Sequence, residues 1–239
     1  MAQPPADGLR KPESCSCWSE YHLSAKAGEA PDPSSSIAHG FSVMLIPELV
    51  SKEECASLLA AGLVAAEAEA VNNSDARLRL ALVSFQPEVQ QAAQVIIQRA
   101  LRLIEDRLPD LASSLFGQTT ELASMELLFA DREPAINIYS VGGEFLPHRD
   151  KHSISVLVPL SQPEVFTGGG TAFWPEEMVA GRRIKRGYEE PPHLLRPQAG
   201  TAMLFCGELM HAAMPVTAGT RAVLVASLTP AAFRYGIRR

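Results

Sequence analysis

The sequence predicts a mainly β protein of the α+β class, with helices packed against one side of an antiparallel β-sandwich or barrel. Three observations predict this class. Two helical patterns precede residue 110, short apolar runs separated by turn residues follow it, and the 239 residues include 18 prolines and 16 glycines. Many prolines and glycines favour short strands and turns over a helical bundle. Helices followed by a run of strands are typical of the α+β class.

Composition limits the partners and the compartment. The chain is 46% apolar and 20% charged, and 21 Lys+Arg against 27 Asp+Glu give a net charge of −6. This balance argues against a nucleic-acid surface built on bulk positive charge. We find no secretory signal and no apolar run long enough to span a bilayer. The Cys15-Ser16-Cys17 pair lacks the spacing of a zinc site. We therefore expect a cytoplasmic protein with no nucleic-acid or membrane partner.

Residues 1–36 are expected to form a disordered leader. The segment is rich in Pro, Ser, Gly and charge, and its few apolar residues recur with no period. Order is expected to begin at Phe41–Ile46, a β-branched and aromatic run that suits a strand. At about 150 residues per domain, the length allows one large domain or two small ones. We expect a single domain over residues 37–235.

Helical support is predicted at about residues 51–108. Ser51 and Glu54 have the spacing of a capping box in front of an apolar run. The helix that they begin is expected to end before Asn72-Asn73-Ser74, because these residues favour turns. A second helix is predicted from about Pro87 to Leu108, where apolar residues form one stripe at helical spacing.

The β core is predicted at about residues 121–228. The expected strands are Met125–Phe129, Ala135–Tyr139, Phe145–Asp150, Ser153–Leu160, Thr171–Trp174, Thr201–Cys206 and Arg221–Leu228. Residues 176–196 interrupt this pattern with a run of mixed charge. A solvated loop is the simpler interpretation of that segment. Since long loops at the end of a sandwich often cover a site, a substrate lid is the alternative.

One triplet and one distant histidine could form a metal site. His148 and Asp150 alternate on a predicted strand, so their side chains would share a face. Alone, the pair fits a salt-bridged surface strand equally well. His211 follows the predicted strand at 201–206 and could supply a third ligand from another strand. Two histidines and one carboxylate on one face of a metal form the triad of non-haem Fe(II) oxygenases.

Arg221 begins the last predicted strand, where a period of two places it on one face with Val223 and Val225. An arginine on an apolar interior face is costly unless it meets an anion. A bound dicarboxylate would supply one, because a guanidinium can grip a carboxylate through paired hydrogen bonds. The alternative is an arginine at a strand edge that reaches solvent.

In their order and spacing, these motifs resemble the Fe(II)/2-oxoglutarate-dependent dioxygenase superfamily, and most closely its prolyl 4-hydroxylase-like branch. The resemblance is carried by Leu45–Cys55, Tyr139–Asp150, Thr167–Phe173, Pro197–Phe205, His211 and Pro215–Arg221. The implied fold is a double-stranded β-helix, a jelly roll with supporting N-terminal helices. Because the strands that carry His148 and His211 must then meet, residues 120–228 belong together.

The resemblance also implies roles for six residues and the cofactors they bind. The catalytic iron ligands would be His148, Asp150 and His211; the residues that bind 2-oxoglutarate would be Arg221, Tyr139 and Thr171. The branch commonly has lysine where this chain has Arg221, while related branches have arginine, so the positive charge is kept. Implied cofactors are Fe(II), 2-oxoglutarate as cosubstrate, O₂ and ascorbate.

The implied function is hydroxylation of a C–H bond in a peptide, such as a prolyl peptide, or in a small molecule, with release of succinate and CO₂. Two alternatives stay open. One is an inactive jelly-roll module that binds a metal or an anion, and the intact triad and Arg221 argue against it. The other is a cupin-like metalloenzyme independent of 2-oxoglutarate, whose activity an Arg221→Ala substitution would leave intact.

Overall fold

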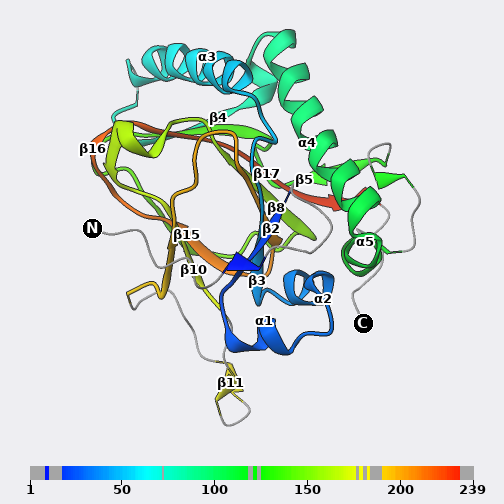
Figure 1. Ribbon diagram of the computed structural model, residues 1–239. Coiled ribbons are helices and arrows are strands. Elements are labelled where there is room, and N and C mark those ends of the chain that lie inside the picture. Colours follow the sequence, from blue (N-terminus) through cyan, green and yellow to red (C-terminus); the bar gives the residue numbers. More distant parts are fainter. Residues whose placement is uncertain are drawn as a thin grey trace.

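Two facing β-sheets form the centre of the molecule, and helices cover the outer face of the larger one (Figure 1). The computed structural model describes residues 9–10, 18–71, 73–117, 121–122, 125–175, 178–179, 182–183 and 190–231. The arrangement is the predicted mainly β architecture of the α+β class, a double-stranded β-helix with supporting helices.

The larger sheet has the order β1-β2-β3-β14-β8-β17-β6-β4, with β5 also paired to β17. Its strands are β1 (Leu9–Arg10), β2 (Ser19–His22), β3 (Ser42–Ile46), β4 (Arg77–Ala81), β5 (Leu127–Phe129), β6 (Ala135–Tyr139), β8 (Ile154–Pro159), β14 (Ala202–Cys206) and β17 (Arg221–Pro230). All of their pairings are antiparallel. The central strands are buried on both faces, which explains their near-continuous apolar sequences.

The smaller sheet faces the larger one and has the order β13-β10-β15-β7. Its strands are β13 (His193–Leu195), β10 (Thr171–Trp174), β15 (Met210–Ala213) and β7 (Phe145–His148). The described residues also form two two-stranded ribbons, one of β16 (Val216–Gly219) with β9 (Phe166–Gly168) and one of β11 (Met178–Val179) with β12 (Arg182–Arg183). A hydrophobic cluster that includes Phe173 from the smaller sheet and Phe205 and Val223 from the larger one packs between the two sheets.

The first predicted helix is α3 (Lys52–Ala70), and it begins with the predicted capping box. The Ser51 hydroxyl accepts a hydrogen bond from the Glu54 N–H at 3.2 Å, and the Glu54 carboxylate accepts one from the Ser51 N–H at 2.8 Å. Cys55, Leu58 and Gly62 are among the buried residues of its inner face. A Cβ at Gly62 would lie 3.0 Å from the Ile136 side chain, so the missing side chain lets α3 lie close against β6.

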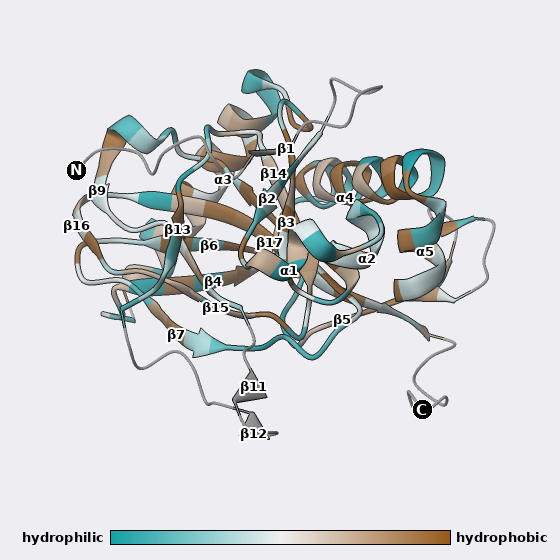
Figure 2. Ribbon diagram, turned by 60° about the horizontal axis from the view of Figure 1, so that its bottom comes forward, coloured by the Kyte–Doolittle hydropathy of each residue, from teal (hydrophilic) through white to brown (hydrophobic). Residues whose placement is uncertain are grey.

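The second predicted helix is α4 (Pro87–Arg107), which ends where Pro109 begins the short helix α5 (Pro109–Phe116). Figure 2 shows hydrophobic and hydrophilic residues alternating around α4, whereas β6 and β17 are largely hydrophobic. The apolar stripe of α4 packs with α3, α5 and the outer face of the large sheet in one core. Of the helices in the described part of the chain, none has the length and apolar character needed to cross a membrane.

The expectation of a disordered leader over residues 1–36 is wrong for its second half. Residues 18–36 include β2, which pairs with β3, together with α1 (Ala25–Glu29) and most of α2 (Pro33–Ala38). Apolar residues are few here, but Trp18 and Leu23 are buried against the core. Their burial and the backbone pairing to β3 order a segment whose composition is otherwise typical of disorder.

Residues 176–196, expected as a loop or lid, are only partly described. The β11–β12 ribbon lies within this segment, and β13 at its end pairs with β10 as an edge strand of the smaller sheet. The end of the segment is therefore a strand instead of a loop. Residues 176–177, 180–181 and 184–189 lie outside the described residues, so the lid stays a prediction.

Candidate functional site

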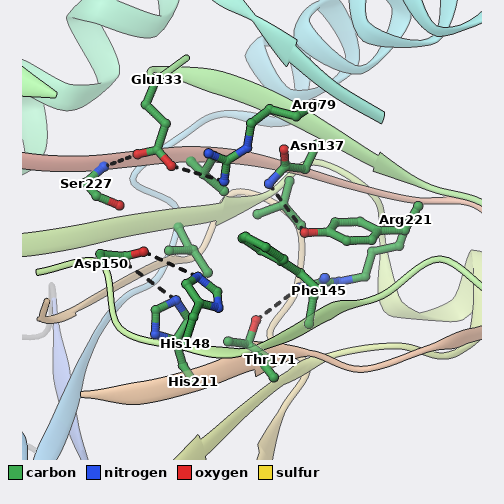
Figure 3. Close-up of a pocket in the computed structure, with 16 residues that line it drawn as sticks. Arg79, Glu133, Asn137, Phe145, His148, Asp150, Thr171, His211, Arg221 and Ser227 are labelled. Carbon is green, nitrogen blue, oxygen red and sulfur yellow. Dashed lines mark hydrogen bonds and ion pairs between the residues drawn. The ribbon is translucent and has the colours of Figure 1, made fainter. Parts of the chain in front are cut away.

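The two sheets bring His148, Asp150 and His211 together from distant parts of the sequence. His148 ends β7, and its Cα lies directly opposite that of His211 in the antiparallel pair of β7 and β15. Asp150 was expected on the same strand, but it lies two residues beyond the end of β7. In Figure 3 the three side chains point toward one another on one side of the pocket.

The donor atoms of the three side chains face a common point. The Nε2 atom of His148 lies 3.4 Å from Asp150 Oδ1, and that of His211 lies 3.5 Å from Asp150 Oδ2. One donor atom from each residue lies within 4.8 Å of the other two. Because metal–nitrogen and metal–oxygen bonds are about 2 Å long, one ion between them can reach all three.

Backbone carbonyls fix the tautomer of both histidines. The Nδ1 atom of His148 lies 2.8 Å from the Leu146 carbonyl oxygen, and that of His211 lies 3.0 Å from the Leu209 carbonyl oxygen. A carbonyl oxygen can only accept, so each Nδ1 carries the proton and donates it. The lone pair is therefore on Nε2, which faces Asp150, as a metal-binding histidine requires.

The charges of the cluster also suit a cation. Burial works to raise the pKa of Asp150, but His211, His148 and the Ser155 hydroxyl outweigh it and lower that pKa well below its usual range. Burial lowers the pKa of His211 and outweighs the opposing effect of Asp150. At neutral pH the carboxylate is therefore ionised and His211 is neutral, the protonation states in which both bind metals. Two imidazoles and one carboxylate on one face fit Fe(II).

A buried cation lies in the same pocket. Arg221 at the start of β17 is 4% exposed, and its guanidinium donates a hydrogen bond to the Thr171 hydroxyl on β10 at 3.0 Å. Burial lowers its pKa. Within the described residues, no carboxylate forms an ion pair with it. An unpaired buried charge is costly, so this guanidinium is suited to receive an anion.

Tyr139 lies beside this cation. Its ring centroid is 5.2 Å from the Arg221 guanidinium carbon, and its hydroxyl oxygen accepts a hydrogen bond from the Asn137 amide nitrogen at 3.3 Å. Burial raises the pKa of Tyr139, so the phenol keeps its proton at neutral pH. Because Asn137 is the donor in this contact, the Tyr139 proton is available for another acceptor.

All six residues that the sequence singled out line one pocket between the two sheets (Figure 3). They are the cluster of His148, Asp150 and His211, and a group in which Arg221 contacts both Tyr139 and Thr171. Apolar side chains, among them Leu157, Val223 and Val225, form part of the remaining wall. The pocket thus combines a metal-ligand cluster with a separate anion-binding group.

Sequence reasoning missed four polar residues of this region. Arg79, Glu133 and Asn137 line the pocket, and Ser155 donates a short hydrogen bond to Asp150 Oδ2. The signal for Asn137 was available, since it is the polar residue of an apolar strand and alternates with Tyr139. Glu133 precedes β6, and its position could not be inferred from any pattern.

Comparison with known proteins agrees with this geometry. Residues 134–227 match the model of the 2OG-Fe(II) oxygenase superfamily, a segment that contains all six residues singled out above. No protein of curated function matches the sequence.

Prolyl hydroxylases are among the solved structures with a similar fold. One is a prolyl hydroxylase from Trichoplax adhaerens in complex with a hypoxia inducible factor peptide, with a TM-score of 0.50 and 12% identity over 86% of this chain and 93% of that one. Another is a prolyl-4-hydroxylase from Pseudomonas putida, with a TM-score of 0.50 and 15% identity over 82% and 95%. The match of residues 134–227 supports the resemblance to the 2OG-Fe(II) oxygenase superfamily, and the two solved structures confirm the predicted fold.

Proposed function

From the match of residues 134–227 to the 2OG-Fe(II) oxygenase superfamily, we propose that this protein is an iron- and 2-oxoglutarate-dependent dioxygenase. It would hydroxylate a C–H bond of a peptide or a small molecule. One observation carries the proposal. A single pocket contains a His-Asp-His cluster and a buried arginine that meets no carboxylate within the described residues. A metal and a dicarboxylate would fill these two places together.

The protein's part in the reaction is to hold and orient the reactants. His148, Asp150 and His211 would hold Fe(II) on one face and leave its other positions open toward the pocket. The bound iron, with 2-oxoglutarate and O₂, would supply the oxidising chemistry that releases succinate and CO₂.

Arg221 would pair with the distal carboxylate of 2-oxoglutarate and so balance its own buried charge. The Thr171 hydroxyl holds the guanidinium in place, and the Tyr139 hydroxyl would donate a hydrogen bond to the same carboxylate. Leu157, Val223 and Val225 make part of the wall apolar, which keeps water away from the reacting groups.

Several finer points belong to this proposal. The similar Trichoplax prolyl hydroxylase binds a peptide, which supports a peptide as one candidate substrate class here. A role for ascorbate is proposed only from the superfamily resemblance. The cytoplasmic location expected from the cysteine pattern likewise stays a prediction.

The proposal is tested by incubating the purified protein with Fe(II), labelled 2-oxoglutarate and panels of peptides and metabolites. We expect succinate formation that falls more than a hundredfold in a His148→Ala variant. Failure to form succinate above this variant with any candidate, together with failure to retain iron, would overturn the proposal.

An Arg221→Ala variant separates the alternatives. Loss of turnover supports the dioxygenase, whereas unchanged turnover favours a cupin-like enzyme that does not use 2-oxoglutarate. Iron retention without any turnover favours the inactive metal-binding module.

A further inference from the structure

A second polar group lines the pocket, in addition to the residues proposed to bind iron and 2-oxoglutarate. It consists of Arg79 on β4, Asn137 on β6 and Glu133 just before β6, which we call the polar cluster. Arg79 and Asn137 are directly opposite in the antiparallel pairing of β4 with β6, so their side chains are neighbours on the same face of the sheet. Figure 3 shows all three beside the metal-ligand cluster.

Within the polar cluster, the carboxylate of Glu133 is already occupied. One oxygen lies 3.2 Å from a terminal guanidinium nitrogen of Arg79, and the other accepts a hydrogen bond from the Ser227 N–H. The charges of Arg79 and Glu133 therefore balance each other. A ligand with a net charge would disturb this balance in a buried place, whereas a neutral ligand would not.

Two atoms of the polar cluster have no partner. The Nε–H of Arg79 and the Oδ1 of Asn137 are both buried, and neither forms a hydrogen bond within the described residues. Asn137 is only 1% exposed, so water in the bulk does not satisfy it. Leaving a buried polar group unsatisfied costs about 1–3 kcal/mol. Both residues line the pocket, and each keeps one unsatisfied buried atom, a donor in Arg79 and an acceptor in Asn137. A ligand with the complementary pair of groups would satisfy both.

We propose that Arg79 and Asn137 bind an amide of the substrate, so that the enzyme acts on amide compounds. Amide groups are neutral and supply both an acceptor and a donor. A substrate C=O would accept from the Arg79 Nε–H, and a substrate N–H on the same side would donate to Asn137 Oδ1. This inference rests on the proposed function, since it assigns the substrate class of the same pocket.

Two kinds of compound present this pair of groups on one side. In an extended peptide, the N–H and C=O of a single residue point the same way, as they do toward a neighbouring strand. A small primary carboxamide has both groups on one unit. Proline lacks the N–H, so in a prolyl peptide the residue bound here would be a neighbour of the proline.

The test measures binding by calorimetry to protein loaded with Fe(II) and 2-oxoglutarate without oxygen, so that no turnover occurs. The probes are N-acetyl methylamides of the amino acids other than proline, matched compounds with the acetylated N–H replaced by an ester oxygen, and small primary carboxamides. We expect at least one amide to bind, and its ester analogue to bind at least tenfold more weakly. Binding of either class of amide supports the proposal. If only the peptide-like amides bind, the substrate is a peptide, and if only the primary carboxamides bind, it is a small carboxamide.

Variants assign the effect to the polar cluster. Arg79→Lys keeps a cation opposite Glu133 but lacks the Nε–H, and Asn137→Leu removes the acceptor at similar size. Each should reduce the difference between amide and ester to less than threefold. Arg99→Lys, in the Arg99–Glu54 pair between α4 and α3 outside the pocket, should bind the probes like the unaltered protein.

The results separate this inference from the proposed function. If the protein with Fe(II) fails to bind 2-oxoglutarate, the proposed function is wrong. If it binds 2-oxoglutarate but none of the amides, or binds amides and esters equally, the amide inference alone is overturned. Full discrimination in both Arg79→Lys and Asn137→Leu would also overturn it.

Discussion

Ser155 is the residue that holds the carboxylate of the candidate metal site in place. It is buried on β8 and donates a hydrogen bond to Asp150 Oδ2. Partners behind a metal ligand commonly contribute ten- to hundredfold to metal affinity. We predict that Ser155→Ala weakens Fe(II) binding by about that factor, measured by competition with a chelator. Ser153→Ala, a matched buried serine two residues earlier, should bind Fe(II) normally; equal affinity of both variants would contradict the role.

Arg221 provides the second prediction for a single residue. Truncating one partner of a buried charge pair typically costs about 2–5 kcal/mol, so Arg221→Met should raise the KM for 2-oxoglutarate more than about thirtyfold. Arg221→Lys keeps the positive charge but lacks the planar guanidinium that can make two parallel hydrogen bonds to a carboxylate. Its KM for 2-oxoglutarate should therefore lie between those of Arg221→Met and the unaltered protein. Steady-state succinate formation at varied 2-oxoglutarate measures both variants. If Arg221→Met kept the KM of the unaltered protein, the anion-binding role would be wrong.

Single site residues could be predicted from the sequence where they belong to a short motif that indicates a chemical role. His148, Asp150 and Arg221 could be singled out because residue type and alternation together imply a role. Arg79 and Glu133 could not, because an arginine and a glutamate separated by 54 residues give no sign of pairing. Their contact depends on the register of β4 against β6, which only the folded sheet determines.

Among the elements, α3 depends most clearly on a local signal. Removing the Ser51 side chain should cost about 1 kcal/mol at neutral pH, since Ser→Ala at an N-cap costs about 0.5–2 kcal/mol. Urea denaturation of Ser51→Ala against the unaltered protein measures this difference. Ser57→Ala, in the middle of the same helix, is the control and should change the free energy of unfolding little. A loss no larger than that of Ser57→Ala would contradict the capping role.

The reciprocal half of the cap depends on pH. Hydrogen bonds from Arg99 and from the Ser51 N–H lower the pKa of Glu54 against the opposing effect of burial. A carboxyl with a lowered folded pKa contributes stability above its unfolded pKa, and this contribution is lost as the pH falls through the folded value. Both side chains are about a third or more exposed, which keeps the effect small. We predict that Glu54→Gln destabilises the protein at pH 7 and less at pH 3 by urea denaturation; an equal loss at both would contradict it.

Helices and strands could be predicted where apolar residues recur with a clear period. A strand was missed where polar residues of the pocket interrupt that pattern. The stripe of α4 and the apolar runs of β6, β10 and β14 follow from periodicity. By contrast, β4 has the sequence Arg-Leu-Arg-Leu-Ala, whose arginines are typical of a solvated segment. In the structure Arg79 lines the pocket between the sheets, and the two leucines pack in the core beneath the helices. The strand therefore alternates as a β-strand should, but its polar side chains are on the face toward the pocket instead of toward solvent.

At the scale of the whole molecule, the segment before β3 is part of the fold. Trp18 is 5% exposed, and truncating a buried Trp to Ala typically costs about 3–5 kcal/mol. We predict a loss of about 3 kcal/mol for Trp18→Ala by urea denaturation, against little change for Val83→Ala, which is 82% exposed. If Trp18→Ala left the free energy of unfolding unchanged, the segment before β3 would not be part of the folded core, as the sequence predicted.

The large sheet also bears on domain organisation. It joins β2 near the start of the described chain to β17 near its end, with strands from between them on either side. We propose that one domain extends from about residue 18 to about residue 231, earlier at its start than the sequence predicted. Composition could not place this start, because a few well-buried residues order a polar segment without changing its average character.

We propose that one pocket holds iron at His148, Asp150 and His211 and 2-oxoglutarate between that iron and Arg221. The most direct measurement is a calorimetric titration of 2-oxoglutarate, without oxygen, into the protein with and without Fe(II). We predict one molecule bound per chain, at least tenfold more tightly when Fe(II) is present, because one end of the molecule then meets the metal. No binding, or equal binding with and without Fe(II), would show that the pocket does not hold iron and 2-oxoglutarate together.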